Sequence, residues 1–109
     1  MELKELKTKL ENSSLMDAMN GHVLSFTQIQ EKDEKLSGNI SLEDESGDMA
    51  DKESTFVIYK NNNDLFLKTD LFTNHISDFT FVLKKYAIEI TLINNPNSNL
   101  NFNYIINTN

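Results

Sequence analysis

The chain has 109 residues and no cysteine, and its 17 acidic against 10 basic residues give a formal net charge of −7 at pH 7. Every basic residue is a lysine, and the lack of arginine together with the negative charge argues against direct nucleic-acid binding. No stretch approaches the roughly 20 apolar residues of a membrane span. Because the N-terminus is charged and cysteine is absent, we expect a cytoplasmic single domain over 1–109.

Residues 1–20 are expected to be helical. One apolar set has the spacing of a helix face: Leu3, Leu6 and Leu10. A second set falls on roughly the opposite side of such a helix: Leu15, Met16 and Met19. We favour a break near Asn12, with Ser14 capping a second short helix that ends at Asn20-Gly21. The alternative is one helix between two partners, which would make the protein an oligomer.

Residues 22–107 are expected to be rich in β-structure, because apolar and polar residues alternate there. The expected strands and turns before residue 70 are a strand at His22–Ile29, a turn at Gln30–Lys35, a strand around Leu36–Leu42 weakened by Gly38, a strand at Thr55–Lys60, a turn at Asn61–Asp64 and a strand at Leu65–Thr69. An acidic loop at 43–54, which has no apolar periodicity, is expected to join the strand around Leu36–Leu42 to the strand at Thr55–Lys60.

The segment Thr73–Lys85 fits two structures. Its apolar residues have helical spacing, whereas Phe79, Phe81 and Leu83 alternate as in a strand. A strand would require the inward-facing set to change from odd to even numbers near Lys84. We favour the helix because it avoids that change.

The strongest pattern is Tyr86–Ile106, where two alternating runs flank a turn rich in Asn and containing the one proline. The side chains expected to face inward are Tyr86, Ile88, Ile90, Leu92, Leu100, Phe102, Tyr104 and Ile106. The whole pattern predicts an α+β fold, in which the N-terminal helical segment precedes a mostly antiparallel sheet of five to seven strands. One further helix is expected near residues 75–86.

The net charge is concentrated in one segment, since Gln30–Glu53 holds nine acidic residues and three lysines. A solvated loop that keeps the chain soluble would explain this, and so would a docking surface that steers a basic partner. The candidate partner-binding residues are Glu43, Asp44, Glu45, Asp48, Asp51 and Glu53. An EF-hand reading fails, because the sixth and twelfth positions counted from Asp44 are Met49 and Thr55.

No catalytic or metal-binding constellation is evident, so no metal or cofactor is expected. His22 and His75 lack neighbouring ligands of metal-site spacing, and a His75–Asp78 pair is best explained as a surface contact. Asp17, His22 and Ser25 have the residue types of a nucleophilic triad without the surrounding elbow.

The function expected from these features is that of a small acidic, non-enzymatic binding or inhibitory protein. Immunity proteins and phage inhibitors, which dock a basic protein through an acidic surface, are the models for this expectation. The alternative is a structural or oligomerising subunit, suggested by the two apolar sets near the N-terminus. The methionines Met16, Met19 and Met49 fit an adaptable binding surface, although ordinary core positions explain Met16 and Met19 better.

Overall fold

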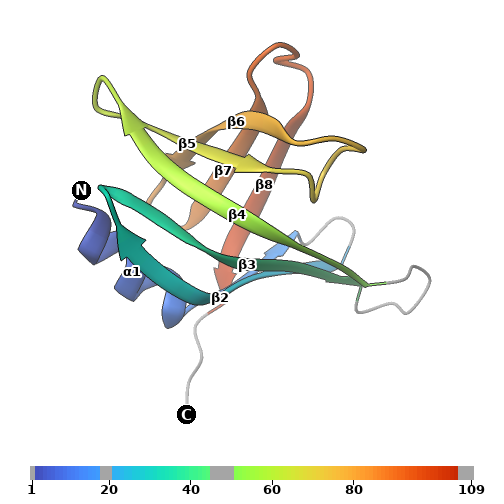
Figure 1. The fold of residues 1–109 in the computed structure, drawn as a ribbon. Coiled ribbons are helices and arrows are strands. Elements are labelled where there is room, and N and C mark those ends of the chain that lie inside the picture. The colour runs from blue at the N-terminus through green and yellow to red at the C-terminus, as the bar shows by residue number, and fades with distance from the viewer. Residues whose placement is uncertain (1, 18–20, 45–50, 106–109) are drawn as a thin grey trace.

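The computed structural model describes residues 2–17, 21–44 and 51–105. These residues form one helix and a closed antiparallel barrel of eight strands, in which each strand pairs with its neighbours along the chain and β1 pairs with β8 (Figure 1). The elements are α1 Leu3–Glu11, β1 Ser14–Asp17, β2 His22–Lys32, β3 Lys35–Asp44, β4 Lys52–Asn61, β5 Asp64–Thr69, β6 Ser77–Leu83, β7 Ala87–Leu92 and β8 Asn99–Ile105. The predicted sheet of five to seven strands is therefore wrong.

The barrel has two distinct ends, because neighbouring strands run in opposite directions. The helix end carries α1 and the tight turns at 33–34, 62–63 and 84–86, and it lies on the left in Figure 1. The loop end carries the longer connections, among them 70–76 and 93–98. Asn62 and Asn63 have positive φ angles of 53° and 73°, so the predicted turn there is confirmed.

The N-terminal segment is helical only up to Glu11, which confirms the predicted break. The second short helix is wrong, because Ser14–Asp17 forms β1. Leu15 lies opposite Leu24 on one side and Tyr104 on the other, and it is buried in the barrel wall. Leu15 and Met16 of the second apolar set belong to this strand and not to a helix, so the alternative of one helix between two partners is also wrong. Met19 lies outside the described residues.

The ambiguous segment before residue 84 is a strand, so the helix that we favoured near 75–86 is wrong. Phe79 and Phe81 of β6 are buried in the barrel, where aromatic side chains fit a pleated wall. The inward-facing set changes from odd to even numbers across the 84–86 turn, as a strand requires. Strand propensity was the better guide here than apolar spacing.

The predicted C-terminal hairpin is confirmed as β7 and β8, with buried Ile88 opposite buried Phe102. Tyr86 is an exception, because it belongs to the turn and is 71% exposed. Ile106 lies outside the described residues.

The turn predicted at Gln30–Lys35 is shorter than expected, because β2 continues to Lys32 through a bulge. Gln28 occupies this bulge with a positive φ of 51°. A Cβ atom on Gly38 would lie 2.7 Å from the Thr27 carbonyl oxygen. Glycine thus permits the close approach of β2 and β3 and does not merely weaken the strand.

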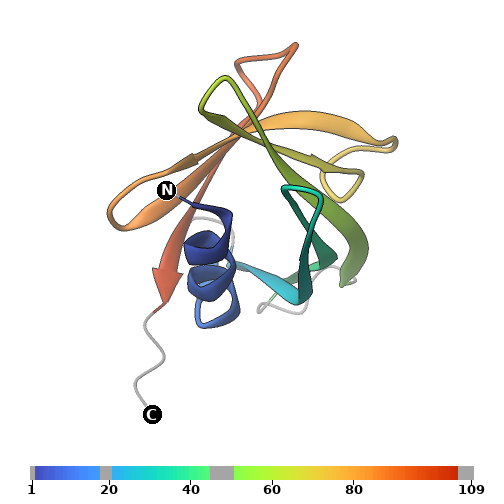
Figure 2. The ribbon, with the colours of Figure 1, turned by 60° about the vertical axis from the view of Figure 1, so that its left-hand side comes forward.

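The barrel interior is filled by side chains and is covered at both ends. Buried Leu6 and Leu10 of α1 close the helix end, where Figure 2 shows α1 between β8 and the β2–β3 hairpin. At the loop end Leu71 is buried, and the Phe72 ring lies 6.3 Å from the Phe102 ring. The buried apolar side chains are Leu3, Leu6, Leu10, Leu15, Leu24, Phe26, Ile29, Leu36, Ile40, Phe56, Ile58, Leu67, Leu71, Phe79, Phe81, Ile88, Ile90 and Phe102.

Candidate functional site

The predicted partner-binding acids lie at the loop end as far as they are described. Glu43 and Asp44 are the last residues of β3, and Glu53 is the second residue of β4. The loop predicted over 43–54 is therefore shorter than expected. Asp51 directly precedes β4 and is exposed. Glu45 and Asp48 lie outside the described residues.

The charged side chains of the described residues are unevenly divided between the two ends. The loop end has seven carboxylates and two lysines, a net charge of −5: Asp17, Glu43, Asp44, Asp51, Glu53, Asp70, Asp78, Lys52 and Lys68. The helix end has eight of each, a net charge of zero: Glu2, Glu5, Glu11, Glu31, Asp33, Glu34, Asp64, Glu89, Lys4, Lys7, Lys9, Lys32, Lys35, Lys60, Lys84 and Lys85. The protein is electrically polarised along the barrel axis.

Three open hollows adjoin one another around the outer wall near the loop end, and we term them together the loop-end groove. Their volumes are about 640, 140 and 410 Å³. Ser54 and Thr55 line both the first and the second, whereas Ile76 lines both the second and the third. The groove therefore runs from β2 and β3 across β4 and β5 to β6 and β7.

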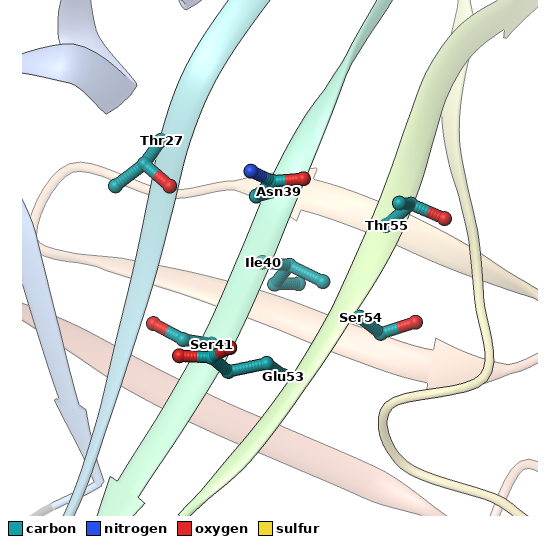
Figure 3. A pocket seen from close by; sticks show the side chains of 7 residues that line it. All are labelled: Thr27, Asn39, Ile40, Ser41, Glu53, Ser54 and Thr55. Atoms are coloured by element: carbon teal, nitrogen blue, oxygen red, sulfur yellow. The ribbon is translucent and has the colours of Figure 1, made fainter.

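The first section of the groove is polar. Figure 3 shows its side chains on three neighbouring strands, among them Thr27 of β2, Asn39 of β3 and Glu53 of β4. The Asn39 amide donates a hydrogen bond of 2.9 Å to the Gln28 side-chain oxygen at the bulge. The bulge thus fixes one wall of this section.

The middle section is held by hydrogen bonds around the start of the 70–76 connection. The Ser54 hydroxyl donates to an Asp70 carboxylate oxygen, and the buried Thr69 hydroxyl donates to the Thr55 carbonyl at 2.9 Å. The Leu71 amide in turn donates to the Thr69 hydroxyl at 3.2 Å. These bonds fix the connection that carries Ile76.

The last section of the groove exposes two large apolar side chains beside polar ones. Ile76 is 68% exposed and Ile93 is 43% exposed, and both line the third hollow. The Ile93 amide donates to the Asp78 carbonyl at 3.3 Å, which joins the start of β6 to the end of β7. Large apolar side chains left in water at such a fixed place often mark an interaction surface.

Asp78 organises the outer face of β4, β5 and β6. Its carboxylate accepts a 2.9 Å hydrogen bond from the Tyr59 hydroxyl and lies 3.8 Å from the Lys68 ammonium. Burial raises the pKa of the Tyr59 phenol above its ordinary 10.0, and the hydrogen bond and charge of Asp78 raise this pKa further. The Tyr59 ring also stacks on Phe66 at 5.5 Å. These contacts hold Asp78 and Lys68, which line the groove, in fixed positions.

The structure does not assemble the triad of residue types seen in the sequence. Asp17 lies opposite His22, but Ser25 is three residues along β2 and therefore faces the other side of the sheet. His75 is exposed in the 70–76 connection and does not start a helix. Within the described residues, no group of three or more His, Cys, Asp or Glu is placed to hold a metal ion.

Comparison of the chain with protein-family models, with curated proteins and with solved structures finds no match. In the described part of the chain, no helix has the length and apolar character needed to cross a membrane.

Sequence reasoning missed the groove residues that follow residue 54. Asp70 and Asp78 lie in the part of the chain after Glu53, where acids and lysines are equal in number, yet Lys60, Lys84 and Lys85 lie at the opposite end of the barrel. An alternating-strand assignment of 77–83 would have placed Asp78 at the loop end. Ile76 fits the apolar face of the helix expected over Thr73–Lys85, but the structure leaves it 68% exposed in the 70–76 connection.

Proposed function

We propose that this protein is a non-enzymatic docking module that binds a basic partner protein through its loop end. The observation that carries this proposal is the charge difference between the ends, −5 against zero over the described side chains. A field of one sign speeds the approach of an oppositely charged partner and orients it. The partner would therefore meet the loop end first.

The packed interior supports a function on the outer surface. A barrel of eight strands is just wide enough to be filled by side chains or to hold one small ligand. Here Phe26, Phe56 and Phe81 meet inside the barrel at ring separations of 5.0 and 6.2 Å. The hollows described above open to solvent on the outer wall and offer their surface to another macromolecule.

The proposal is tested with two variants of equal charge change. The loop-end variant is Glu43→Gln, Asp51→Asn and Glu53→Gln, and the helix-end control is Glu31→Gln, Asp33→Asn and Glu34→Gln. All six side chains are exposed, so both variants should keep the wild-type Tm. The probe is a 12-residue lysine-rich peptide, with its glutamate-rich counterpart as a second control.

We expect the loop-end variant to slow association of the lysine-rich peptide about tenfold at low salt, and the helix-end variant to change it little. High salt should remove the difference, since the Debye length falls from about 10 Å at 0.1 M to about 3 Å at 1 M. Equal effects of both variants, or association that is insensitive to salt, would contradict the proposal.

A further inference from the structure

We infer that the loop-end groove takes an extended segment of the basic partner and that Ile76 and Ile93 hold one large apolar side chain of that segment. This inference rests on the function proposed above and adds the form and chemistry of the ligand. It predicts an apolar residue flanked by lysines or arginines as the recognised pattern.

The dimensions of the groove fit an extended segment. It crosses the wall from β3 to β7, which is four strand spacings, or about 19 Å along the surface at about 4.8 Å per spacing. An extended chain rises about 3.3 Å per residue, so about six residues span that length. The third hollow, with about 410 Å³, has room for a leucine- or phenylalanine-sized side chain.

The charges around the groove favour a cationic segment. Glu53 lines the first hollow, Asp70 the second and Asp78 the third, against the single lysine Lys68. The Lys68 ammonium lies near Asp78, 3.8 Å away, so Glu53 and Asp70 give the groove its negative excess. Positive side chains two or three residues before the apolar one would reach these carboxylates.

The apolar end is preorganised for binding. Leu71 is buried and Phe72 packs edge-on against Phe79 at 5.6 Å, so the connection that carries Ile76 is fixed to the core. Ile93 is tied to β6 through the Asp78 carbonyl. A surface that is already ordered loses little conformational entropy on binding, which favours its use as an anchor.

The test is a selection from a pool of 12-residue peptides with lysine at alternate positions and randomised residues between them. The proteins compared are the wild type, the Ile76→Ser/Ile93→Ser variant and a control with Val82→Ser and Tyr86→Ser. The control removes two apolar side chains at the helix end that are 44% and 71% exposed. If the double variant has a lowered Tm, the single variant Ile76→Ser replaces it in the comparison, because Ile76 lies in a connection outside the strands.

We expect the wild type and the control to enrich peptides with Leu, Ile, Phe or Met at one position, at least about tenfold over the pool. The Ile variants should retain lysine-rich peptides without that enrichment. If the wild type retains lysine-rich peptides without preferring an apolar residue, the inference that Ile76 and Ile93 hold an apolar side chain is wrong, whereas the proposed function stands. If the wild type retains the lysine pool no better than a glutamate pool, both proposals fail.

Discussion

The two ends of the barrel close the same core in different ways. At the helix end, buried Leu6 and Leu10 of α1 cover the interior, the turns are tight and the charges balance. At the loop end, Leu71 and Phe72 of a connection cover the interior, and the outer surface keeps an excess of carboxylates with exposed Ile76. The difference teaches that either a helix or a short connection can close the core with two apolar side chains among the described residues.

The largest effect is expected from Phe102→Ala, because Phe102 is 2% exposed and its ring lies beside that of Phe72 in the loop-end closure. Loss of a buried aromatic ring should cost about 3–5 kcal/mol of unfolding free energy. Chemical denaturation measures this cost, and Tyr86→Ala in the neighbouring turn is the exposed control. A cost below about 1 kcal/mol would place Phe102 at the surface.

Leu6→Ala tests whether α1 is an integral part of the barrel. Leu6 is fully buried, and its truncation should cost about 2–5 kcal/mol of unfolding free energy. Leu71→Ala is the corresponding truncation at the loop end, and we expect a similar loss of unfolding free energy. If Leu6→Ala has no effect on the denaturation midpoint while Leu71→Ala does, the helix end is not closed by α1.

Two tyrosines should respond in opposite ways to loss of their hydroxyl groups. Tyr59→Phe removes a hydrogen bond to Asp78 and should destabilise the protein by about 1 kcal/mol. The Tyr104 hydroxyl, whose ring lies under the Lys9 ammonium of α1, is buried and has no hydrogen-bond partner among the described residues, so Tyr104→Phe should be neutral or stabilising.

Burial raises the pKa of Tyr104 as well as that of Tyr59. Neither phenol's ionisation therefore weakens the fold below about pH 10, and the free energy of unfolding falls as the pH rises from there through their higher folded pKa values. Denaturation at pH 7 and pH 11 measures both effects. Equal destabilisation by the two substitutions at pH 7 would contradict this account of Tyr104.

The smallest effect concerns Glu89 at the helix end. Hydrogen bonds from Lys84, at 2.6 Å, and from Asn99 hold the pKa of the Glu89 carboxyl below its ordinary 4.5. Its contribution to stability is therefore present above about pH 4.5 and disappears as the pH falls through the lower folded pKa. The small Tm deficit of Glu89→Gln at pH 7 should vanish near pH 2, and a deficit that stays constant would argue against the pair.

The hairpins could be predicted from the sequence because both partners of each pair are close along the chain. The runs around Ile88 and Phe102 alternate between apolar and polar residues with a clear period of two. The asparagines at 61–64 favour a turn, because asparagine tolerates a positive φ. Four residues are too few to show a period, so β1 was taken for a helix. Closure of the barrel depends on contacts between Leu15 and Tyr104, which no local pattern reveals.

The candidate site was only half predictable for a related reason. Glu43 and Glu53 belong to one acidic run, and that run could be read directly. The groove also needs Asp70, Ile76 and Ile93, which come from different connections. Only the strand directions show that Lys60, Lys84 and Lys85 lie at the opposite end of the barrel from Asp70.

The pairing of β1 with both β2 and β8 has a consequence for how the chain folds during synthesis. Ser14 pairs with Ile105, so the last wall contact can form only after β8 has been synthesised. Until then the nascent sheet has two open edges, one on each side of the gap that β8 must fill. The insertion of β8 between β1 and β7 is therefore the step that leaves the barrel without open strand edges.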